Sequence, residues 1–129
     1  MGIVADKIKD LKVREKKILQ MGGEKAVAKH KDKGKLTARE RLNILFDQGP
    51  FKEIDMFVTH RCGNFGMAEV DIPSDGVITG HGLVEGRPVF AFAQDFTARA
   101  GSLGEMHAKK ICKIMDLALK AGVPFVGLN

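Results

Sequence analysis

The sequence has 129 residues, of which 44% are hydrophobic and 29% are charged, and its formal net charge is +5. This length suits one modest domain, and no stretch approaches the roughly 20 apolar residues that a membrane-spanning helix needs. The first residues lack an apolar run of the signal-peptide type, so we expect a cytoplasmic protein.

The first predicted element is a helix over Val4–Gln20. Ile8, Leu11 and Leu19 form a narrow apolar stripe among lysines, and the Gly22-Gly23 pair ends the helix. Such an arm buries little apolar surface by itself. We therefore expect it to pack on a neighbouring chain or on a part of the protein outside this sequence.

A second helix is predicted to begin at Thr37. Glu40 follows three residues later, which makes the pair a capping box, and the apolar residues from Leu42 to Phe46 have helical spacing. Gly49-Pro50 is expected to end this helix.

Cations gather at the start of this second helix. Lys35 lies just before its first turn, and Arg39 and Arg41 lie in or near that turn. Backbone N–H groups at a helix start attract anions, so this segment is a candidate phosphate cradle. The alternative is that the two arginines pair with acidic neighbours such as Asp47. More generally, the basic residues from Lys7 to Arg41 indicate either a polyanionic partner or a solvated helix face.

The middle of the chain has the clearest β-strand signals. Alternating apolar residues over 54–58 are typical of an edge strand. Val77–Val84 and Arg87–Gln94 are two apolar runs joined by Glu85-Gly86, which predicts a β-hairpin.

The last third predicts a helix over Leu103–Ala121 followed by a short buried strand over Phe125–Asn129. Ser102 and Glu105 form a second capping-box pattern at the start of this helix. The predicted apolar face of the helix consists of Ala108, Ile111, Cys112, Met115, Ala118 and Leu119. Strand, helix and strand in this order form one βαβ unit with a right-handed crossover. The predicted class is therefore α/β.

The sequence indicates no metal site and no catalytic residue. Cys62 and Cys112 lack CxxC spacing and are expected to be buried thiols, and the four histidines are scattered. His81 alternates within a strand, as a structural residue does. His107 lies near a helix start, where it could serve as an acid or base, but the sequence shows no partner for it.

Several segments together indicate one family. They follow one another in the family's order and comprise Lys33–Arg41, Asp55–Val58, His60–Cys62, Asn64–Met67, Pro73, Asp75–Gly80, Phe92–Thr97 and Gly101–Ile111. In these segments the chain resembles the front of the carboxyltransferase subunit of biotin-dependent acyl-CoA carboxylases. The most similar members are propionyl-CoA carboxylase β-chains and the α-chains of methylmalonyl-CoA and glutaconyl-CoA decarboxylases.

The resemblance implies a fold and a reaction. The fold would be part of a crotonase-type spiral of ββα units, with residues 1–34 as a helical arm and 35–129 as the truncated front of the carboxyltransferase N-terminal domain. Members move a carboxyl group between carboxybiotin and the α-carbon of an acyl-CoA thioester. In the family, the last strand leads into an Asp-Ser-Gly-Gly-Ala-Arg segment that supplies an oxyanion hole. This segment is absent from the sequence, so we expect the chain alone to bind but not to react.

The resemblance also suggests contacts and partners. Lys35, Arg39 and Arg41 would contact CoA phosphates, whereas Gln94, Asp95 and Ser102 would shape the floor of the acyl-CoA site. Biotin would be carried by a partner protein or domain. The expected partners are the remainder of the carboxyltransferase, a biotin carrier protein, and a biotin carboxylase or a membrane decarboxylase subunit, in a homo-oligomer.

Two other functions fit less of the sequence. A non-catalytic CoA-binding or assembly module would keep the same front end of the fold. A nucleic-acid binder would suit the basic charge, but the chain lacks aromatic stacking platforms and any motif that reads bases.

Overall fold

The computed structural model describes residues 2–48 and 51–129. The helices are α1 (Ile3–Leu19), α2 (Glu24–Lys31), α3 (Ala38–Leu45) and α4 (Glu105–Ala121), and the strands are β1 (Lys52–Ile54), β2 (Val77–Val84), β3 (Arg87–Gln94) and β4 (Phe125–Leu128). The predicted stop of the second helix at Gly49-Pro50 lies outside the described residues. None of the helices in the described part of the chain is long and apolar enough to cross a membrane.

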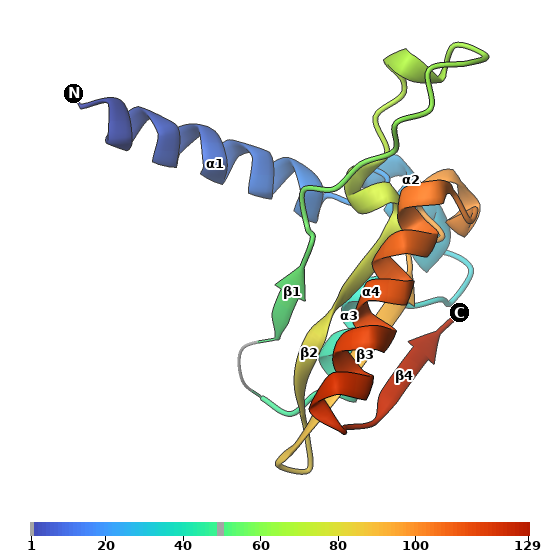
Figure 1. Ribbon diagram of the computed structural model, residues 1–129. Coiled ribbons are helices and arrows are strands. Elements are labelled where there is room, and N and C mark those ends of the chain that lie inside the picture. The colour runs from blue at the N-terminus through green and yellow to red at the C-terminus, as the bar shows by residue number, and fades with distance from the viewer. Residues whose placement is uncertain (1, 49–50) are drawn as a thin grey trace.

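The four strands form one mixed sheet in the order β1-β2-β3-β4. The β1–β2 and β2–β3 pairs are antiparallel, and β3 and β4 are parallel. Helix α4 crosses one face of the sheet and α3 lies on the other, so β2 and β3 are covered on both faces (Figure 1). The predicted βαβ unit is thus present as β3, α4 and β4.

The hairpin between β2 and β3 forms as predicted. Glu85 and Gly86 both have positive φ angles, 49° and 75°, as a two-residue turn with the twist of a hairpin requires. The carboxylate of Asp47 accepts hydrogen bonds from the backbone N–H groups of these two residues at 2.9 and 2.8 Å. Asp47 therefore holds the hairpin turn. The alternative that the two arginines pair with acidic neighbours holds for Arg39, whose partner is Glu53 rather than Asp47.

The predicted edge strand over 54–58 is mostly wrong, because the observed edge strand β1 covers Lys52–Ile54 and overlaps the prediction only at Ile54. Strand β1 ends at Ile54, because Asp55 adopts a left-handed conformation with φ 59° and turns the chain out of the sheet. Residues 55–72 then form an excursion beyond the sheet before β2 begins (Figure 1).

The prediction of a second capping box, formed by Ser102 and Glu105, is wrong. The residue that caps α4 is Gly104, without a side-chain hydrogen bond, and the Ser102 hydroxyl instead donates to the carbonyl of Arg99 at 2.6 Å. The N–H of His107, in the first turn of α4, donates to the carboxylate of Asp75 at 2.7 Å. A side chain far away in the sequence has thus taken the role predicted for Ser102.

The predicted apolar face of α4 is only partly confirmed, because Ala118 is buried and Ala108 and Ile111 are half-buried. Cys112 is exposed, and the side chains of Met115 and Leu119 are 48% and 81% exposed. The face that meets the sheet consists of His107, Lys110, Ile114 and Ala118, all buried. The prediction of two buried thiols fails as well, because Cys62 is exposed too.

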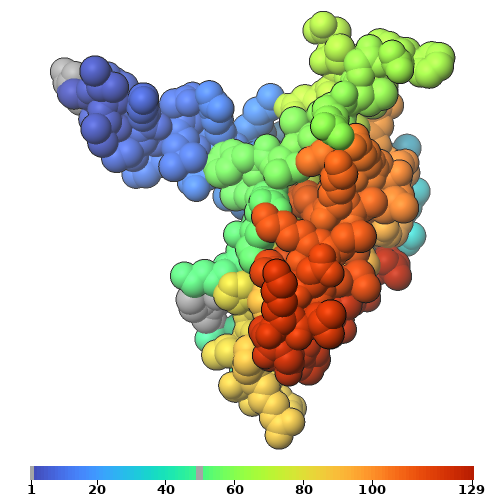
Figure 2. Space-filling view, in the orientation of Figure 1, coloured from blue at the N-terminus to red at the C-terminus, as the bar shows by residue number. Residues whose placement is uncertain are grey.

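Helix α1 extends away from the rest of the chain, as the space-filling view shows (Figure 2). None of its residues is buried. The expected helical arm is confirmed as a helix. Helix α2 lies within the helical arm expected over residues 1–34, but no separate helix was predicted there, because the segment is short, basic and poor in large apolar residues.

Candidate functional site

A hollow of about 400 Å³ lies where β3 and β4 end at their carboxyl termini. In open α/β sheets, this edge is where ligands bind. Its lining combines two cations with two rings and comprises His30, Lys35, Leu36, Arg41, Phe96 and Asn129. These residues come from α2, from the α2–α3 connection, from α3 and from the segments that follow β3 and β4, so five parts of the chain build the hollow.

Lys35 and Arg41, two of the three predicted phosphate contacts, meet in this hollow. Lys35 is exposed and Arg41 is half-buried. A guanidinium N–H of Arg41 donates to the backbone oxygen of Asn129 at 3.1 Å, which orients the side chain. The site is therefore electropositive and partly pre-organised.

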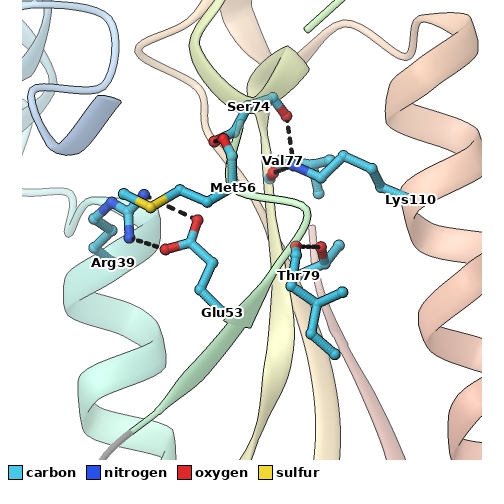
Figure 3. A network of polar contacts seen from close by, with 8 residues as sticks. Arg39, Glu53, Met56, Ser74, Val77, Thr79 and Lys110 are labelled. Atoms are coloured by element: carbon cyan, nitrogen blue, oxygen red, sulfur yellow. Dashed lines mark hydrogen bonds and ion pairs between the residues drawn. The ribbon is translucent and has the colours of Figure 1, made fainter. Parts of the chain in front are cut away.

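Arg39 does not line the hollow. Its guanidinium makes two hydrogen bonds to the carboxylate of Glu53, at 2.7 and 3.1 Å, and the two side chains are only 18% and 12% exposed. Figure 3 shows Arg39 reaching from α3 to Glu53 on β1. The charge of Arg39 is thus already paired, which separates it from the cations that face the hollow.

The backbone part of the predicted phosphate cradle is occupied from within the chain. The Glu40 N–H donates to the Thr37 hydroxyl at 3.3 Å, and the Thr37 N–H donates to the Glu40 carboxylate at 2.9 Å, so the first capping box is confirmed. A carboxylate at the helix start leaves little attraction for another anion there. Any anion in the hollow would therefore depend on the lysine and arginine side chains.

Two contacts hold α2 against the start of α3. The ammonium of Lys31 lies 2.5 Å from the carboxylate of Glu40, and a ring nitrogen of His30 lies 3.0 Å from the carbonyl of Leu36. The hydrogen bond from Lys31, followed by that from the Thr37 backbone, lowers the pKa of Glu40 to about 2. This clamp fixes the wall of the hollow that carries His30 and Lys35.

We expect the Glu40 carboxyl to titrate near pH 2 rather than near its ordinary value of about 4.3. Because the folded pKa is depressed, the stabilisation by the clamp is present above about pH 4.3 and is lost as the pH falls through about 2. Carboxyl-carbon NMR of the chain measures this pKa directly. Lys31→Met should move the midpoint upward, and a wild-type midpoint near 4.3 would contradict the clamp.

Asp95 and Ser102, two of the residues predicted to shape the floor of the acyl-CoA site, do not line the hollow. Asp95 is 3% exposed, and its carboxylate accepts from the N–H and the hydroxyl of Thr97 at 2.9 and 2.6 Å. The Thr97 hydroxyl in turn accepts from the N–H of Gly22 at 2.9 Å, so Asp95 fastens the α1–α2 joint to the end of β3. Ser102 lines a different hollow of about 590 Å³ together with Arg61.

Gln94 is associated with a buried histidine. His107 is fully buried, and its Nδ1 lies 2.8 Å from the carbonyl of Asp75, which can only accept, so Nδ1 carries the proton. Its Nε2 then faces the amide nitrogen of Gln94 at 3.5 Å. Burial lowers the pKa of His107, which stays neutral. The hydrogen bonds of His107 are thus made within the fold, as those of a structural residue are.

The buried Lys110 was not predicted from the sequence. Its ammonium donates to the carbonyls of Ser74 and Val77 at 2.7 and 2.6 Å, on the opposite side of β2 from Arg39 (Figure 3). Burial lowers the pKa of Lys110 to about 8. No sequence signal marks this lysine among the others. Within residues 2–48 and 51–129, no three His, Cys, Asp or Glu side chains gather as they would around a metal ion.

Sequence comparisons show that this chain is similar to carboxyltransferase proteins. The profile of the carboxyl transferase domain family matches residues 29–129. The α subunit of methylmalonyl-CoA decarboxylase from Propionigenium modestum is 58% identical over 129 residues, which cover all of this chain and 25% of that protein. The mitochondrial propionyl-CoA carboxylase β-chain of Homo sapiens is 53% identical over 110 residues, covering 84% of this chain and 20% of that one.

Solved structures agree with these relatives. A transcarboxylase 12S structure with methylmalonyl-coenzyme A and methylmalonic acid bound, described as a hexamer assembly, superposes with a TM-score of 0.93 at 40% identity. The superposition covers all of this chain and 26% of the transcarboxylase chain. The predicted fold class, part of a crotonase-type α/β fold, is confirmed by these neighbours. The chain spans about a quarter of the length of the curated relatives it matches.

Proposed function

The chain belongs to the carboxyl transferase domain family, which confirms the resemblance in its sequence, and on this premise we propose that it provides an acyl-CoA-binding part of a biotin-dependent acyl-CoA carboxyltransferase. The observation that carries the proposal is the electropositive hollow at the ends of β3 and β4, where Lys35 and Arg41 meet. Coenzyme A carries phosphate groups, which are the anions that such a pair of cations suits.

The two cations suit different parts of this task. The Arg41 guanidinium can donate two parallel hydrogen bonds to one phosphate, whereas the Lys35 ammonium acts as a point charge on a flexible stem. Because Arg39 is paired with Glu53, our proposal assigns the phosphate contacts to Lys35 and Arg41 only. Gln94, Asp95 and Ser102 do not line this hollow, so we assign them no phosphate contact, and their role in shaping the floor of the acyl-CoA site stays a prediction.

The proposal concerns binding and assigns no chemical step to these residues. In the complete enzyme, a carboxyl group would move between carboxybiotin and the α-carbon of an acyl-CoA such as propionyl-CoA or methylmalonyl-CoA. The hollow offers cations, which suit phosphate better than the neutral ring of biotin, so we place no biotin contact in it. Biotin would arrive on a carrier protein or domain, with the remainder of the carboxyltransferase and a carboxylase or membrane decarboxylase subunit as partners in a cytoplasmic homo-oligomer.

Calorimetric titration of the chain with propionyl-CoA tests the hollow. Removing a charge-assisted contact to phosphate costs about 1.5–3 kcal/mol, so we expect Arg41→Ala to weaken binding about tenfold or more. Lys35→Ala should weaken binding by a smaller factor, because an exposed lysine forms a looser contact. The matched control is Lys33→Ala, which removes an exposed lysine outside the hollow and should leave the affinity unchanged.

Two results would decide against this function. If wild-type chain does not bind propionyl-CoA, the proposal fails as a whole. If binding is present but Arg41→Ala and Lys35→Ala behave like the Lys33 control, the hollow is not the phosphate site. A non-catalytic acyl-CoA-binding module would give the same binding results, and only turnover in the complete assembly separates it from an enzyme part.

A further inference from the structure

The excursion over residues 55–72 has few buried contacts of its own. None of the residues from Asp55 to Asp71 is buried. A segment with so little buried surface can open while the rest of the fold stays intact. Each ion pair that joins the excursion to a neighbouring element has an exposed cation, so water screens the attraction. These pairs are Lys17 with Asp71, Arg61 with Glu105 and Lys113 with Asp55.

The base of the excursion is the turn Pro73–Gly76, which leads into β2. Ser74 and Asp75 both have positive φ angles, 53° and 49°, which are unfavourable for residues other than glycine. Both residues are buried. The Ser74 hydroxyl donates to the carbonyl of Met56 at 2.7 Å, so the two ends of the excursion meet at this turn (Figure 3). The surrounding contacts must therefore hold a strained turn in place.

Lys110 of α4 supplies the contact beneath this turn. Its ammonium donates to the carbonyls of Ser74 and Val77, on either side of the strained residues, and the lysine is 2% exposed. Among the described residues, no carboxylate forms an ion pair with it. The charged and titratable side chains that face it come from every neighbouring element and are Arg39 of α3, Glu53 of β1, Asp55 of the excursion, Asp75 of the turn and His107 of α4.

The protonation state of Lys110 affects how well it fits this place. A buried ammonium without an ion-pair partner has lost hydration that two carbonyls replace only in part. The neutral amine still has two N–H groups, which suffice for the two carbonyls, and it has little hydration to lose. The closed arrangement therefore suits the neutral amine, whereas an open arrangement, with the side chain in water, suits the ammonium.

We propose that Lys110 is a protonation-sensitive latch, which lets the excursion and the turn Pro73–Gly76 open away from α4 more often when its amine is protonated than when it is neutral. The inference goes beyond the proposed function and does not depend on it, because Lys110 does not line the hollow of Lys35 and Arg41. Opening moves one wall of the larger hollow of about 590 Å³. The excursion contributes His60, Arg61, Cys62, Met67 and Ile72 to that wall.

The direction of the pH dependence follows from the two states of the lysine. In the closed state, burial outweighs the nearby carboxylates and lowers the pKa of Lys110 from 10.5 to about 8. In the open state, the hydrated lysine keeps its ordinary value. Protons therefore favour the open state, and the open fraction should fall about tenfold between pH 7 and pH 9.

A thiol placed at position 72 measures this opening. Ile72 is 8% exposed, so in Ile72→Cys the thiol reacts with a thiol reagent only when the excursion opens. The exposed Cys62 and Cys112 are first replaced by serine. Dividing the reaction rate by that of a short peptide with the same cysteine gives the open fraction and removes the titration of the thiol. With Lys110→Met added, we expect the open fraction to stay constant between pH 7 and pH 9.

Two controls make the result specific. Lys109→Met removes the neighbouring exposed lysine of α4 and should leave the tenfold pH dependence intact. Ile78→Cys, at a 2% exposed position in β2, reports unfolding of the sheet and should react more slowly than Ile72→Cys. Thermal unfolding shows that each variant is folded.

Three results would overturn the latch. The first is an open fraction that is equal at pH 7 and pH 9 while Lys110 is present. The second is a pH dependence that persists in folded Lys110→Met. The third is equal open fractions from the probes at positions 72 and 78, which would mean that the excursion does not open separately. None of these results bears on the binding of propionyl-CoA, so the proposed function is tested independently.

Discussion

Replacing Glu53 with alanine is expected to lower the free energy of unfolding by about 3–5 kcal/mol, the range observed when one partner of a buried ion pair is removed. Glu53 is the partner of Arg39, and both side chains are mostly shielded from water. The guanidinium Nε of Arg39 is already buried with no hydrogen-bond partner among the described residues. Without the carboxylate, a buried cation would remain with nothing to compensate its lost hydration.

A second arginine–glutamate pair provides the matched control. Arg61 and Glu105 also pair through two hydrogen bonds, but their side chains are 67% and 51% exposed. Water screens an exposed pair, so Glu105→Ala should lower the stability far less than Glu53→Ala does. Urea unfolding at neutral pH measures both. Equal effects of the two variants would show that Arg39 and Glu53 are hydrated in solution.

The double variant Arg39→Met with Glu53→Met separates charge from packing. Replacing a whole buried pair by apolar residues of similar size is often neutral, so this variant should recover most of the stability lost by Glu53→Ala. It should also bind propionyl-CoA with wild-type affinity, because Arg39 lies outside the hollow. If the double variant folds but binds propionyl-CoA more weakly than wild type, Arg39 does contribute to phosphate binding.

The sequence predicted those features that depend on neighbouring residues. The Glu85-Gly86 hairpin and the Thr37–Glu40 capping box are local, because each is formed by residues a few positions apart. Ser102 and Glu105 carry the same pattern and do not form a box. The two segments differ because of tertiary contacts. Glu105 pairs with Arg61, and the carboxylate of the distant Asp75 accepts the hydrogen bond from the His107 N–H in the first turn of α4.

The buried face of α4 shows why the periodicity was misleading. Apolar spacing pointed to Met115 and Leu119, yet the helix places Lys110 against the sheet. The buried carbonyls of Ser74 and Val77 at the start of β2 need donors, and the ammonium of Lys110 supplies hydrogen bonds to both. Such a demand arises from a turn 33 or more residues away in the sequence, so no local pattern reveals it.

The candidate site was predictable in part for the same reason. Lys35 and Arg41 follow from the charge cluster near a helix start, and the structure brings them together. Their companions His30 and Phe96 could not be found, because α2 has no apolar periodicity and Phe96 lies in a loop. The two rings lie on the same hollow only in the folded chain, because the Lys31–Glu40 clamp positions His30 and the end of β3 positions Phe96.

Strand β1, which carries Glu53, approaches β2 closely enough to require glycine, and Gly80→Ala is expected to destabilise the chain by about 3 kcal/mol. A Cβ at Gly80 would lie 2.2 Å from the carbonyl of Lys52 and 2.6 Å from the ring of Phe51. Overpacking usually costs about 1–3 kcal/mol, and a clash with backbone is at the upper end because rotamer changes cannot relieve it. Gly63→Ala is the control, since nothing lies within 4 Å of a Cβ there.

The two expected effects should be coupled, because Gly80 is paired with Glu53 in the sheet. If the methyl group displaces β1, it also draws Glu53 away from Arg39, and part of its cost is the loss of that ion pair. In the Arg39→Met, Glu53→Met background, Gly80→Ala should therefore cost less than in wild type by about 1 kcal/mol or more. Urea unfolding of the wild type, the Gly80→Ala variant, the double variant and the triple variant gives this difference. Additive costs would mean that β1 keeps its place and that the clash is absorbed within β2.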